Sequence, residues 1–176
     1  MSKNIWGPKL WYIIHSIAYL YPESDNQNIK YFYYQFIQFI YEIIPCPSCQ
    51  KHFLRLLKNH KLDVNKLNKK YLIDWTVQIH NQVNNRLHKP YFNRDTTHYK
   101  NINHKIFIWY INYLGIEVLK NNKPRSTFIK FVLFLTYVLP KGNIWKKMFN
   151  VNHFSNVSKV YFHKNLKLFI RELYEY

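Results

Sequence analysis

The chain contains two cysteines, Cys46 and Cys49, at Cys-x-x-Cys spacing. Two thiols at this spacing can close a small disulfide, and Pro45 and Pro47 are placed to end one helix and open the next. A thiol at a helix N-terminus lies near the positive end of the peptide dipoles, which favours the thiolate and lowers its pKa. The pattern therefore predicts a redox-active pair rather than a structural disulfide.

Three chemistries use this spacing, and the cysteines alone leave all three open. A zinc site needs four ligands, but no second cysteine pair exists, so His52 and His60 would have to complete it. A thioredoxin-like site would follow a β-strand, whereas the residues before Cys46 have a helical pattern. The third option is a dithiol in a helical bundle that passes electrons to a flavin.

The elements that must position these cysteines are predicted to be helices. Hydrophobic residues make up 48% of the 176 residues and aromatic residues 19%, and long stretches place the rings at helical spacing. We expect an all-α protein. The predicted helices span 8–19, 29–43, 47 to a polar connection at 59–68, 70–88, 106–114 capped by Gly115, 126–139 with Ser126 as N-cap, and 157–174.

Two of these helices carry polar residues beside an apolar face. In the first, Trp11 and His15 share one side, and a lone histidine there is typical of a buried core position. In the fourth, His80 and Asn84 lie four residues apart and project from one flank. Without further information, such a row is typical of an ordinary exposed helix face.

The formal net charge of +17 raises the question of nucleic-acid binding. Lys, Asn, Ile and Tyr are abundant along the whole chain, which favours a solvated surface over a basic binding face. The first residues lack the pattern of a secretory signal, so we expect an intracellular protein. The longest apolar run, 128–139, is shorter than the roughly 18–20 residues that span a bilayer, so a buried helix is expected rather than a transmembrane one.

Four separated stretches decide between the three chemistries, because together they resemble the FAD-linked sulfhydryl oxidases of the Erv/ALR family. The most specific stretch is His-Asn-x-Val-Asn at 80–84, which continues to Lys89-Pro90. The Trp-Gly-Pro-x-x-Trp opening at 6–11 is most similar to the versions carried by large cytoplasmic DNA viruses. The other two stretches are Tyr21-Pro22 and the Cys-x-x-Cys motif itself.

The resemblance covers about residues 5–99 and implies a four-helix bundle with a short fifth helix that holds FAD and forms a homodimer. It divides the chain into an oxidase domain, 1–100, and a helical C-terminal extension of unknown role, 101–176. The implied catalytic residues are Cys46 and Cys49, with no metal. The implied FAD contacts are Gly7, Pro8, Lys9, Trp11, His15, Tyr19, Cys49, His80, Asn81, Val83, Asn84, Leu87, Lys89 and Tyr99.

The resemblance also implies a reaction. A substrate thiolate attacks Cys46, Cys49 is released beside the flavin, and reduced FAD passes the electrons to O2, giving hydrogen peroxide. Many relatives carry further cysteines as a structural disulfide or a shuttle pair, and this chain has neither. A dithiol protein, thioredoxin-like or another redox relay protein, must then reach Cys46 directly. The virus-like opening suggests the host cytoplasm and the virion as the place of action.

The competing class is a non-enzymatic, basic, helical binding module. In that interpretation the cysteines are structural, and the partner is nucleic acid or a virion protein. The resemblance favours the oxidase.

Overall fold

A computed structural model describes residues 2–23, 26–93, 99 and 101–175. The chain divides into two compact units, an N-terminal unit, Met1–Ile102, and a C-terminal unit, Asn103–Tyr176. Every regular element in the described residues is a helix, which confirms the predicted all-α class. Most of the segment expected to hold a short fifth helix, residues 94–98 and 100, lies outside the described residues.

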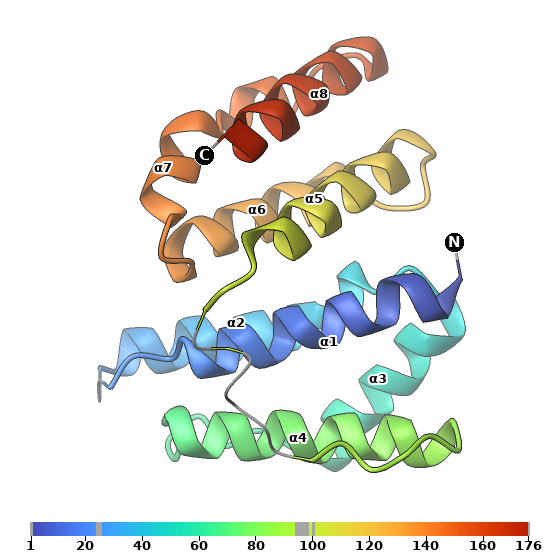
Figure 1. Cartoon of the computed structure of the whole chain (residues 1–176), viewed down its shortest axis with the longest axis vertical. Helices are drawn as coiled ribbons and strands as arrows, with labels where there is room; N and C mark the ends of the chain where they lie inside the picture. Colours follow the sequence, from blue (N-terminus) through green and yellow to red (C-terminus); the bar gives the residue numbers. More distant parts are fainter. Residues whose placement is uncertain (1, 24–25, 94–98, 100, 176) are drawn as a thin grey trace. The chain divides into compact units, whose positions relative to one another are not determined.

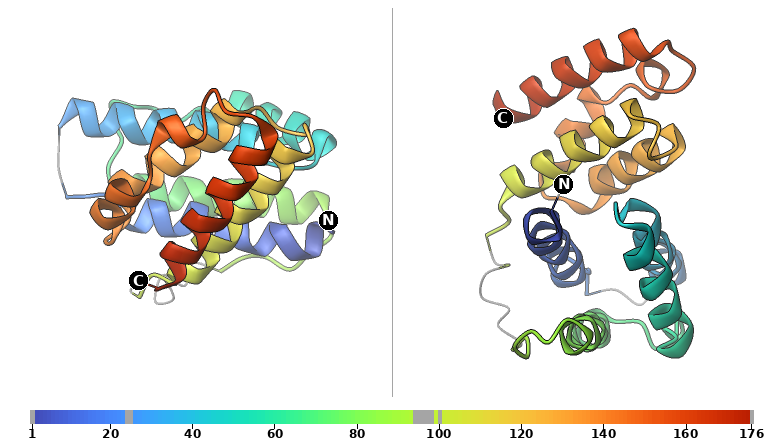
Figure 2. Two further views of the ribbon diagram at one scale, coloured as in Figure 1. Left: turned by 90° about the horizontal axis from the view of Figure 1, so that it is seen from above. Right: turned by 90° about the vertical axis from the view of Figure 1, so that its right-hand side faces the viewer.

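The N-terminal unit contains α1 (Lys3–Tyr19), α2 (Gln27–Ile43), α3 (Pro47–Asn59) and α4 (Lys69–Arg86). Helix α1 packs on α4, and α2 packs on α3. Figure 1 shows α1 and α4 running in opposite directions, and the right-hand view of Figure 2 looks along these helices. Trp11 and His15 on α1 can therefore meet His80 on α4.

Helix α1 begins at Lys3 and not at Pro8, so the expected start was wrong by five residues. The side chain of Ser2 caps the helix by accepting a hydrogen bond from the backbone N–H of Asn4. Pro8 lies inside the helix, where its missing N–H costs one backbone hydrogen bond. The helix ends at Tyr19, as predicted.

Helix α4 ends at Arg86, two residues before the predicted end. His88 adopts a left-handed backbone conformation with φ 51°, and the N–H of Lys89 donates to the carbonyl of Asn84. This turn reverses the chain, and Figure 1 shows the following segment running back along α4.

The C-terminal unit contains α5 (His104–Leu119), α6 (Arg125–Val138), α7 (Gly142–Met148), a 3-10 helix η2 (Val151–His153) and α8 (Lys159–Glu175). Helix α5 packs on both α6 and α8, and α6 also packs on α7. The sequence did not predict α7 or η2. These short elements are positioned by the buried rings of Trp145 and Phe154 rather than by a strong local pattern.

Two helix boundaries in this unit correct the sequence prediction. Gly115 does not cap a helix but lies inside α5, where a Cβ atom would come within 2.6 Å of the Leu166 side chain on α8. It is therefore a site of close helix packing. Ser126 is not the N-cap of α6, because the helix begins one residue earlier, at Arg125, with Pro124 in the cap position.

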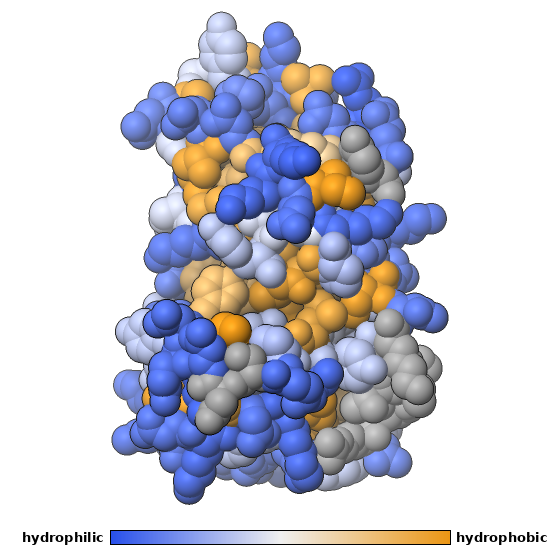
Figure 3. Space-filling view, turned by 90° about the vertical axis from the view of Figure 1, so that its left-hand side faces the viewer, coloured by the Kyte–Doolittle hydropathy of each residue, from blue (hydrophilic) through white to orange (hydrophobic). Residues whose placement is uncertain are grey.

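On the face shown in Figure 3, hydrophilic residues alternate with patches of hydrophobic ones. Within the described ranges, every helix is too short or too polar to cross a membrane.

Candidate active site

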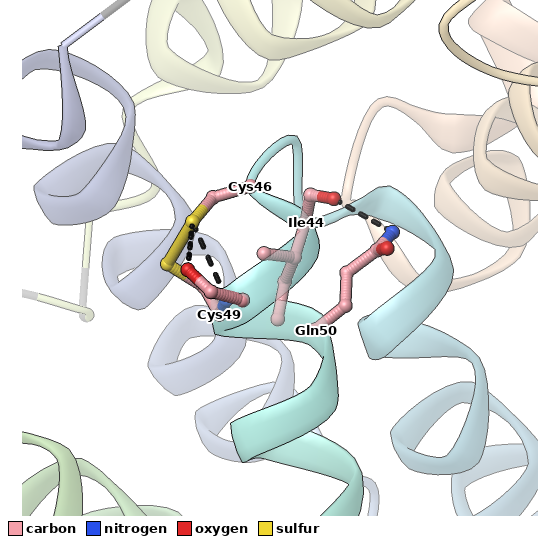
Figure 4. Close-up of a disulfide and its surroundings, with 5 residues drawn as sticks. Ile44, Cys46, Cys49 and Gln50 are labelled. Atoms are coloured by element: carbon pink, nitrogen blue, oxygen red, sulfur yellow. Dashed lines mark hydrogen bonds between the residues drawn. A yellow bond between two sulfur atoms is a disulfide. The ribbon is translucent and has the colours of Figure 1, made fainter.

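The two cysteines form a disulfide at the start of α3. Cys46 is the N-cap residue, and its Sγ accepts from the backbone N–H of Cys49 at 3.3 Å (Figure 4). The Ser48 hydroxyl lies 3.2 Å from the same sulfur and must be the donor, because a disulfide sulfur carries no proton. On reduction, these donors and the helix N-terminus would stabilise a thiolate at Cys46.

The turn that leads into the disulfide is held by a side chain from the next helical turn. Gln50 Nε2 donates to the carbonyl of Ile44 at 2.9 Å, as Figure 4 shows. Ile44 is buried, whereas Cys46 and Cys49 are each half-buried. The pair is thus fixed in place and partly accessible, as exchange with a thiol requires.

A cavity of about 470 Å³ lies in the N-terminal unit, and Cys49 contributes to its wall. This volume is typical of small-molecule and cofactor sites. Cys46 does not belong to the described lining. The two cysteines are therefore unequal, since Cys49 lines the cavity and Cys46 does not. The described lining is Lys3, Trp6, Gly7, Pro8, Leu10, Trp11, Tyr12, Ile14, His15, Ile44, Cys49, His52, Phe53, His80, Val83, Asn84, Arg86, Leu87, Lys89, Pro90, Phe92 and Tyr99.

One wall of the cavity is a stack of aromatic rings. The His80 imidazole stacks on Trp11 with ring centroids 4.0 Å apart and on Phe92 with centroids 4.4 Å apart. His15 stacks on the same Phe92 at 4.6 Å, and Tyr99 lies 5.8 Å from His15. These groups come from α1, α4 and the segment that follows α4.

The histidines of this wall are neutral at pH 7. Burial, with the nearby His80, lowers the pKa of His15 to about 3. Burial, with the charge of Lys89, lowers the pKa of His80 to about 4. His15 Nε2 and His80 Nδ1 lie 2.9 Å apart, which is hydrogen-bonding distance.

The charged groups of the described lining are all cations, namely Lys3, Arg86 and Lys89. FAD combines two flat ring systems with an anionic pyrophosphate, so it needs aromatic surfaces and positive charge in one site. The cavity supplies both, and one residue of the disulfide, Cys49, belongs to its wall. The residues present therefore fit FAD.

Most of the FAD contacts that the sequence suggested lie in the wall of this one cavity. Among them, Val83 is half-buried and Leu87 is 44% exposed, because that end of α4 faces the cavity. The suggested residues that line the cavity are Gly7, Pro8, Trp11, His15, Cys49, His80, Val83, Asn84, Leu87, Lys89 and Tyr99.

Three suggested contacts do not belong to the described lining. Lys9 Nζ donates to the carbonyl of Ile5 on the outside of α1. Tyr19 is half-buried at the end of α1, with the Lys69 ammonium 4.9 Å from its ring centroid. Asn81 instead binds the backbone of Phe92 in the segment that follows α4.

Asn81 holds that returning segment in place. Its amide donates to the carbonyl of Phe92 at 3.1 Å, and its side-chain oxygen accepts from the N–H of Phe92 at 2.7 Å. Asn84 Nδ2 adds a hydrogen bond to the carbonyl of Pro90 at 3.0 Å. Two asparagines of the His-Asn-x-Val-Asn row therefore fix the position of the Phe92 ring.

Sequence reasoning missed several lining residues, of which His52 and Phe92 are chemically the most relevant. His52 was considered only as a zinc ligand, yet it follows Cys49 by three residues on α3, and helical periodicity alone places the two on one face. Its Nε2 is buried without a hydrogen-bond partner, and the residue belongs to the cavity lining. Phe92 gave no signal, because its position depends on the chain reversal at His88.

Comparisons with known proteins agree with this site. The chain is 33% identical over 108 residues to the FAD-linked sulfhydryl oxidase of African swine fever virus (isolate Warthog/Namibia/Wart80/1980), covering 61% of this chain and 87% of that protein. It is 32% identical over 85 residues to the probable FAD-linked sulfhydryl oxidase R368 of Acanthamoeba polyphaga mimivirus, covering 48% and 59%.

A cellular protein is also similar. The mitochondrial FAD-linked sulfhydryl oxidase ERV1 of Saccharomyces cerevisiae is 31% identical over 86 residues, covering 49% of this chain and 44% of that protein. No solved structure is significantly similar to the chain. The model of the Erv1/Alr family matches residues 8–104, which is more than half of the chain and includes both cysteines and the wall from Pro8 to Tyr99. The chain therefore belongs to the Erv1/Alr family.

Proposed function

We propose that the protein is an FAD-dependent thiol oxidase that forms disulfide bonds in partner proteins. The observation that carries this proposal is the position of Cys49 in the wall of a cavity whose rings and cations suit FAD. Family membership and relatives named FAD-linked sulfhydryl oxidase support it.

The reaction begins at Cys46. A substrate thiolate attacks Cys46 Sγ, the Cys46–Cys49 bond breaks, and Cys49 leaves as a thiolate while a mixed disulfide forms. The second substrate thiolate then attacks the substrate sulfur of this mixed disulfide, which forms the product disulfide and releases Cys46 as a thiolate. Ser48 and the N–H of Cys49 stabilise the released Cys46 sulfur. Bound FAD would supply the acceptor for the electron pair of the reduced cysteines and would pass that pair to O2, giving hydrogen peroxide.

The residues around the cavity would hold FAD in three ways. The rings of Trp11 and Phe92, which stack on the two faces of His80, provide flat apolar contact. Lys3, Arg86 and Lys89 offset the pyrophosphate charge. His52 and Asn84 offer polar atoms to the cofactor from α3 and α4.

The natural substrate would be a dithiol protein that reaches Cys46 directly, thioredoxin-like or another redox relay protein. The absence of further cysteines in the chain supports direct access, since no shuttle pair can carry electrons inward. Similarity to oxidases of large DNA viruses supports a viral protein that acts in the host cytoplasm and the virion. A homodimer is expected from the family resemblance, and analytical ultracentrifugation of the purified protein would test it.

Two measurements test the proposed function. The purified protein is expected to be yellow with a flavin spectrum, and to consume O2 in the presence of dithiothreitol. Cys49→Ser should reduce O2 uptake to background while keeping its FAD and its helical circular dichroism. Full turnover of Cys49→Ser would remove the role assigned to this sulfur. A colourless preparation that FAD cannot reconstitute would instead support the basic binding module.

A further inference from the structure

A hydrogen-bonded chain of three side chains runs from the core to the cavity wall. Thr76 Oγ1 lies 2.8 Å from the carbonyl oxygen of Ile73 and 3.1 Å from His15 Nδ1. His15 Nε2 lies 2.9 Å from His80 Nδ1. Thr76 and His15 are buried, and Thr76 does not belong to the described cavity lining. These hydrogen bonds thus connect the buried hydroxyl of Thr76 to the His80 ring, which lines the cavity.

The direction of the hydrogen bonds is fixed at the Thr76 end. A carbonyl oxygen can only accept, so the single hydroxyl proton of Thr76 is donated to Ile73. Thr76 Oγ1 can then only accept from His15, and the proton of that ring must be on Nδ1. His15 is neutral because burial lowers its pKa to about 3, so its Nε2 carries no proton.

The protonation of His15 in turn fixes the protonation of His80. Since His15 Nε2 carries no proton, it must accept, and His80 Nδ1 must donate. His80 is also neutral at pH 7, because burial and Lys89 lower its pKa to about 4. Its Nε2 is therefore unprotonated and can only accept a hydrogen bond.

The rings stacked on His80 determine which of its atoms a cavity ligand can contact. Trp11 and Phe92 both stack on the imidazole, at centroid distances of 4.0 and 4.4 Å, and two rings at such distances cannot share one face. Both faces are covered and Nδ1 is occupied, so the polar atom left for a cavity ligand is Nε2. We propose that Thr76 is a positioning residue that fixes the tautomers of His15 and His80, so that His80 offers Nε2 as a hydrogen-bond acceptor to a donor group of bound FAD.

This inference rests on the proposed function for the identity of the ligand, but not for the tautomers. The Nδ1–H tautomer is the less common one for a free imidazole side chain in water. Its presence at both His15 and His80 would therefore report the influence of Thr76. Because Thr76 touches neither FAD nor the cysteines in this scheme, its effect must act through the two imidazoles.

The first experiment measures the tautomers by long-range 1H–15N NMR of the full chain, labelled at histidine and studied as purified, whatever its flavin content. We expect unprotonated Nε2 at both His15 and His80 in the wild type. Thr76→Val removes the acceptor for His15 Nδ1 and should move the proton of both rings to Nε2. Thr76→Ser keeps the hydroxyl and should keep the wild-type pattern.

The second experiment measures the Kd of FAD by flavin fluorescence. Thr76→Val should weaken binding about tenfold, because a donor on His80 would replace the acceptor that a FAD donor group needs, whereas Thr76→Ser should bind within about twofold of the wild type. Nε2–H at His80 in the wild type would overturn the inference by itself, even if Thr76→Val failed to fold. A changed tautomer with an unchanged Kd would overturn the assignment of FAD as the ligand of Nε2.

The two proposals can fail separately. A protein that does not bind FAD would contradict the proposed function and, with it, the ligand assigned to Nε2. The NMR spectra of that same protein would still confirm or refute the role of Thr76 in setting the tautomers.

Discussion

Both units of this protein are helical and rich in aromatic rings, but they use the rings differently. In the C-terminal unit, Phe128, Phe149, Phe154, Phe162 and Phe169 contact one another, and every one of them is buried. These rings close on themselves and form a core. In the N-terminal unit, rings of similar size surround a cavity of about 470 Å³.

The difference lies in what stands between the rings. In the N-terminal unit, His15 and His80 lie among the aromatic rings, and their hydrogen bonds position the stack without filling the cavity. In the phenylalanine cluster of the other unit the rings contact one another directly, and the Arg125 guanidinium, a charged group, lies 5.5 Å from the Phe162 ring centroid. Packing between the rings therefore sets most of the geometry of that cluster. Aromatic residues in a helical sequence therefore predict a packed core. A cofactor site is indicated only where polar side chains also lie at fixed positions among the rings.

The largest predicted effect is a loss of stability when a ring of the phenylalanine cluster in the C-terminal unit is removed. Phe128→Ala should lower the free energy of unfolding by about 3–5 kcal/mol, because the ring is fully buried between helices and its removal leaves a cavity. Urea unfolding followed by circular dichroism would measure it. The matched control is Tyr161→Ala, a ring 61% exposed on α8, which should change stability by less than about 0.5 kcal/mol. An equal loss of unfolding free energy in Phe128→Ala and Tyr161→Ala would contradict the view that the phenylalanine cluster forms the core of this unit.

The second prediction concerns how the stability of the protein depends on pH through His15, one of the rings around the cavity. The unfolded chain protonates His15 near its ordinary pKa of 6.5, whereas the folded protein keeps it neutral down to a pKa of about 3. The unfolded state binds more protons in this window, so stability falls as pH falls, by about 2 kcal/mol from pH 6.5 to pH 5 for this group. His15→Gln should remove that part of the slope.

Unfolding experiments at several pH values would test this. His163→Gln, at an exposed position on α8, is the control and should leave the slope unchanged. If His15→Gln and the wild type lose stability equally over this range, His15 is not held neutral in the folded protein.

The third prediction separates binding from stability. Phe92→Ala should raise the Kd of FAD about tenfold, because it removes the ring that stacks on both His15 and His80. Its cost in stability should be well below that of Phe128→Ala, since Phe92 is only half-buried. The neighbouring Tyr91, 77% exposed, provides the control, and Tyr91→Ala should bind FAD like the wild type. Fluorescence titration distinguishes the two variants, and unchanged binding by Phe92→Ala would place FAD away from the stack.

The smallest predicted effect is electrostatic. Lys89→Gln should weaken FAD binding by a few-fold at low salt, because one cation of the cavity wall is lost near the expected pyrophosphate. High salt should reduce the difference, since Lys89 is exposed and its charge is screened. Lys58→Gln, on the exposed side of α3, should have no effect at either salt concentration. A loss that does not depend on salt would argue against a role for the Lys89 charge.

The helical class and most boundaries were predictable, because apolar periodicity and the prolines that flank Cys46 are local signals. The starts of α1 and α6 were not, since Ser2 and Pro124 gave weaker signals than Pro8 and Ser126. The pattern around Gly115 predicts a helix cap, because the real constraint on this residue, contact with Leu166, lies 51 positions away (166 − 115). Short elements such as α7 depend on distant packing and carry little local pattern.

The sequence by itself predicted a redox-active Cys46–Cys49 pair and the all-helical class from residue types and short spacings, and it indicated the family through four separated stretches. The resemblance implied that Cys49 faces the flavin, and the structure adds that Cys49 lines a cavity. Only the tertiary structure decided that the chain reversal at His88 brings Phe92 onto the histidines, and that Thr76, His15 and His80 lie within hydrogen-bonding distance of one another. His15 is separated from Thr76 by 61 positions and from His80 by 65, and no local pattern reports such contacts. They exist because α1 and α4 must bury their apolar faces against each other, and that packing places the polar groups beside those faces within hydrogen-bonding distance.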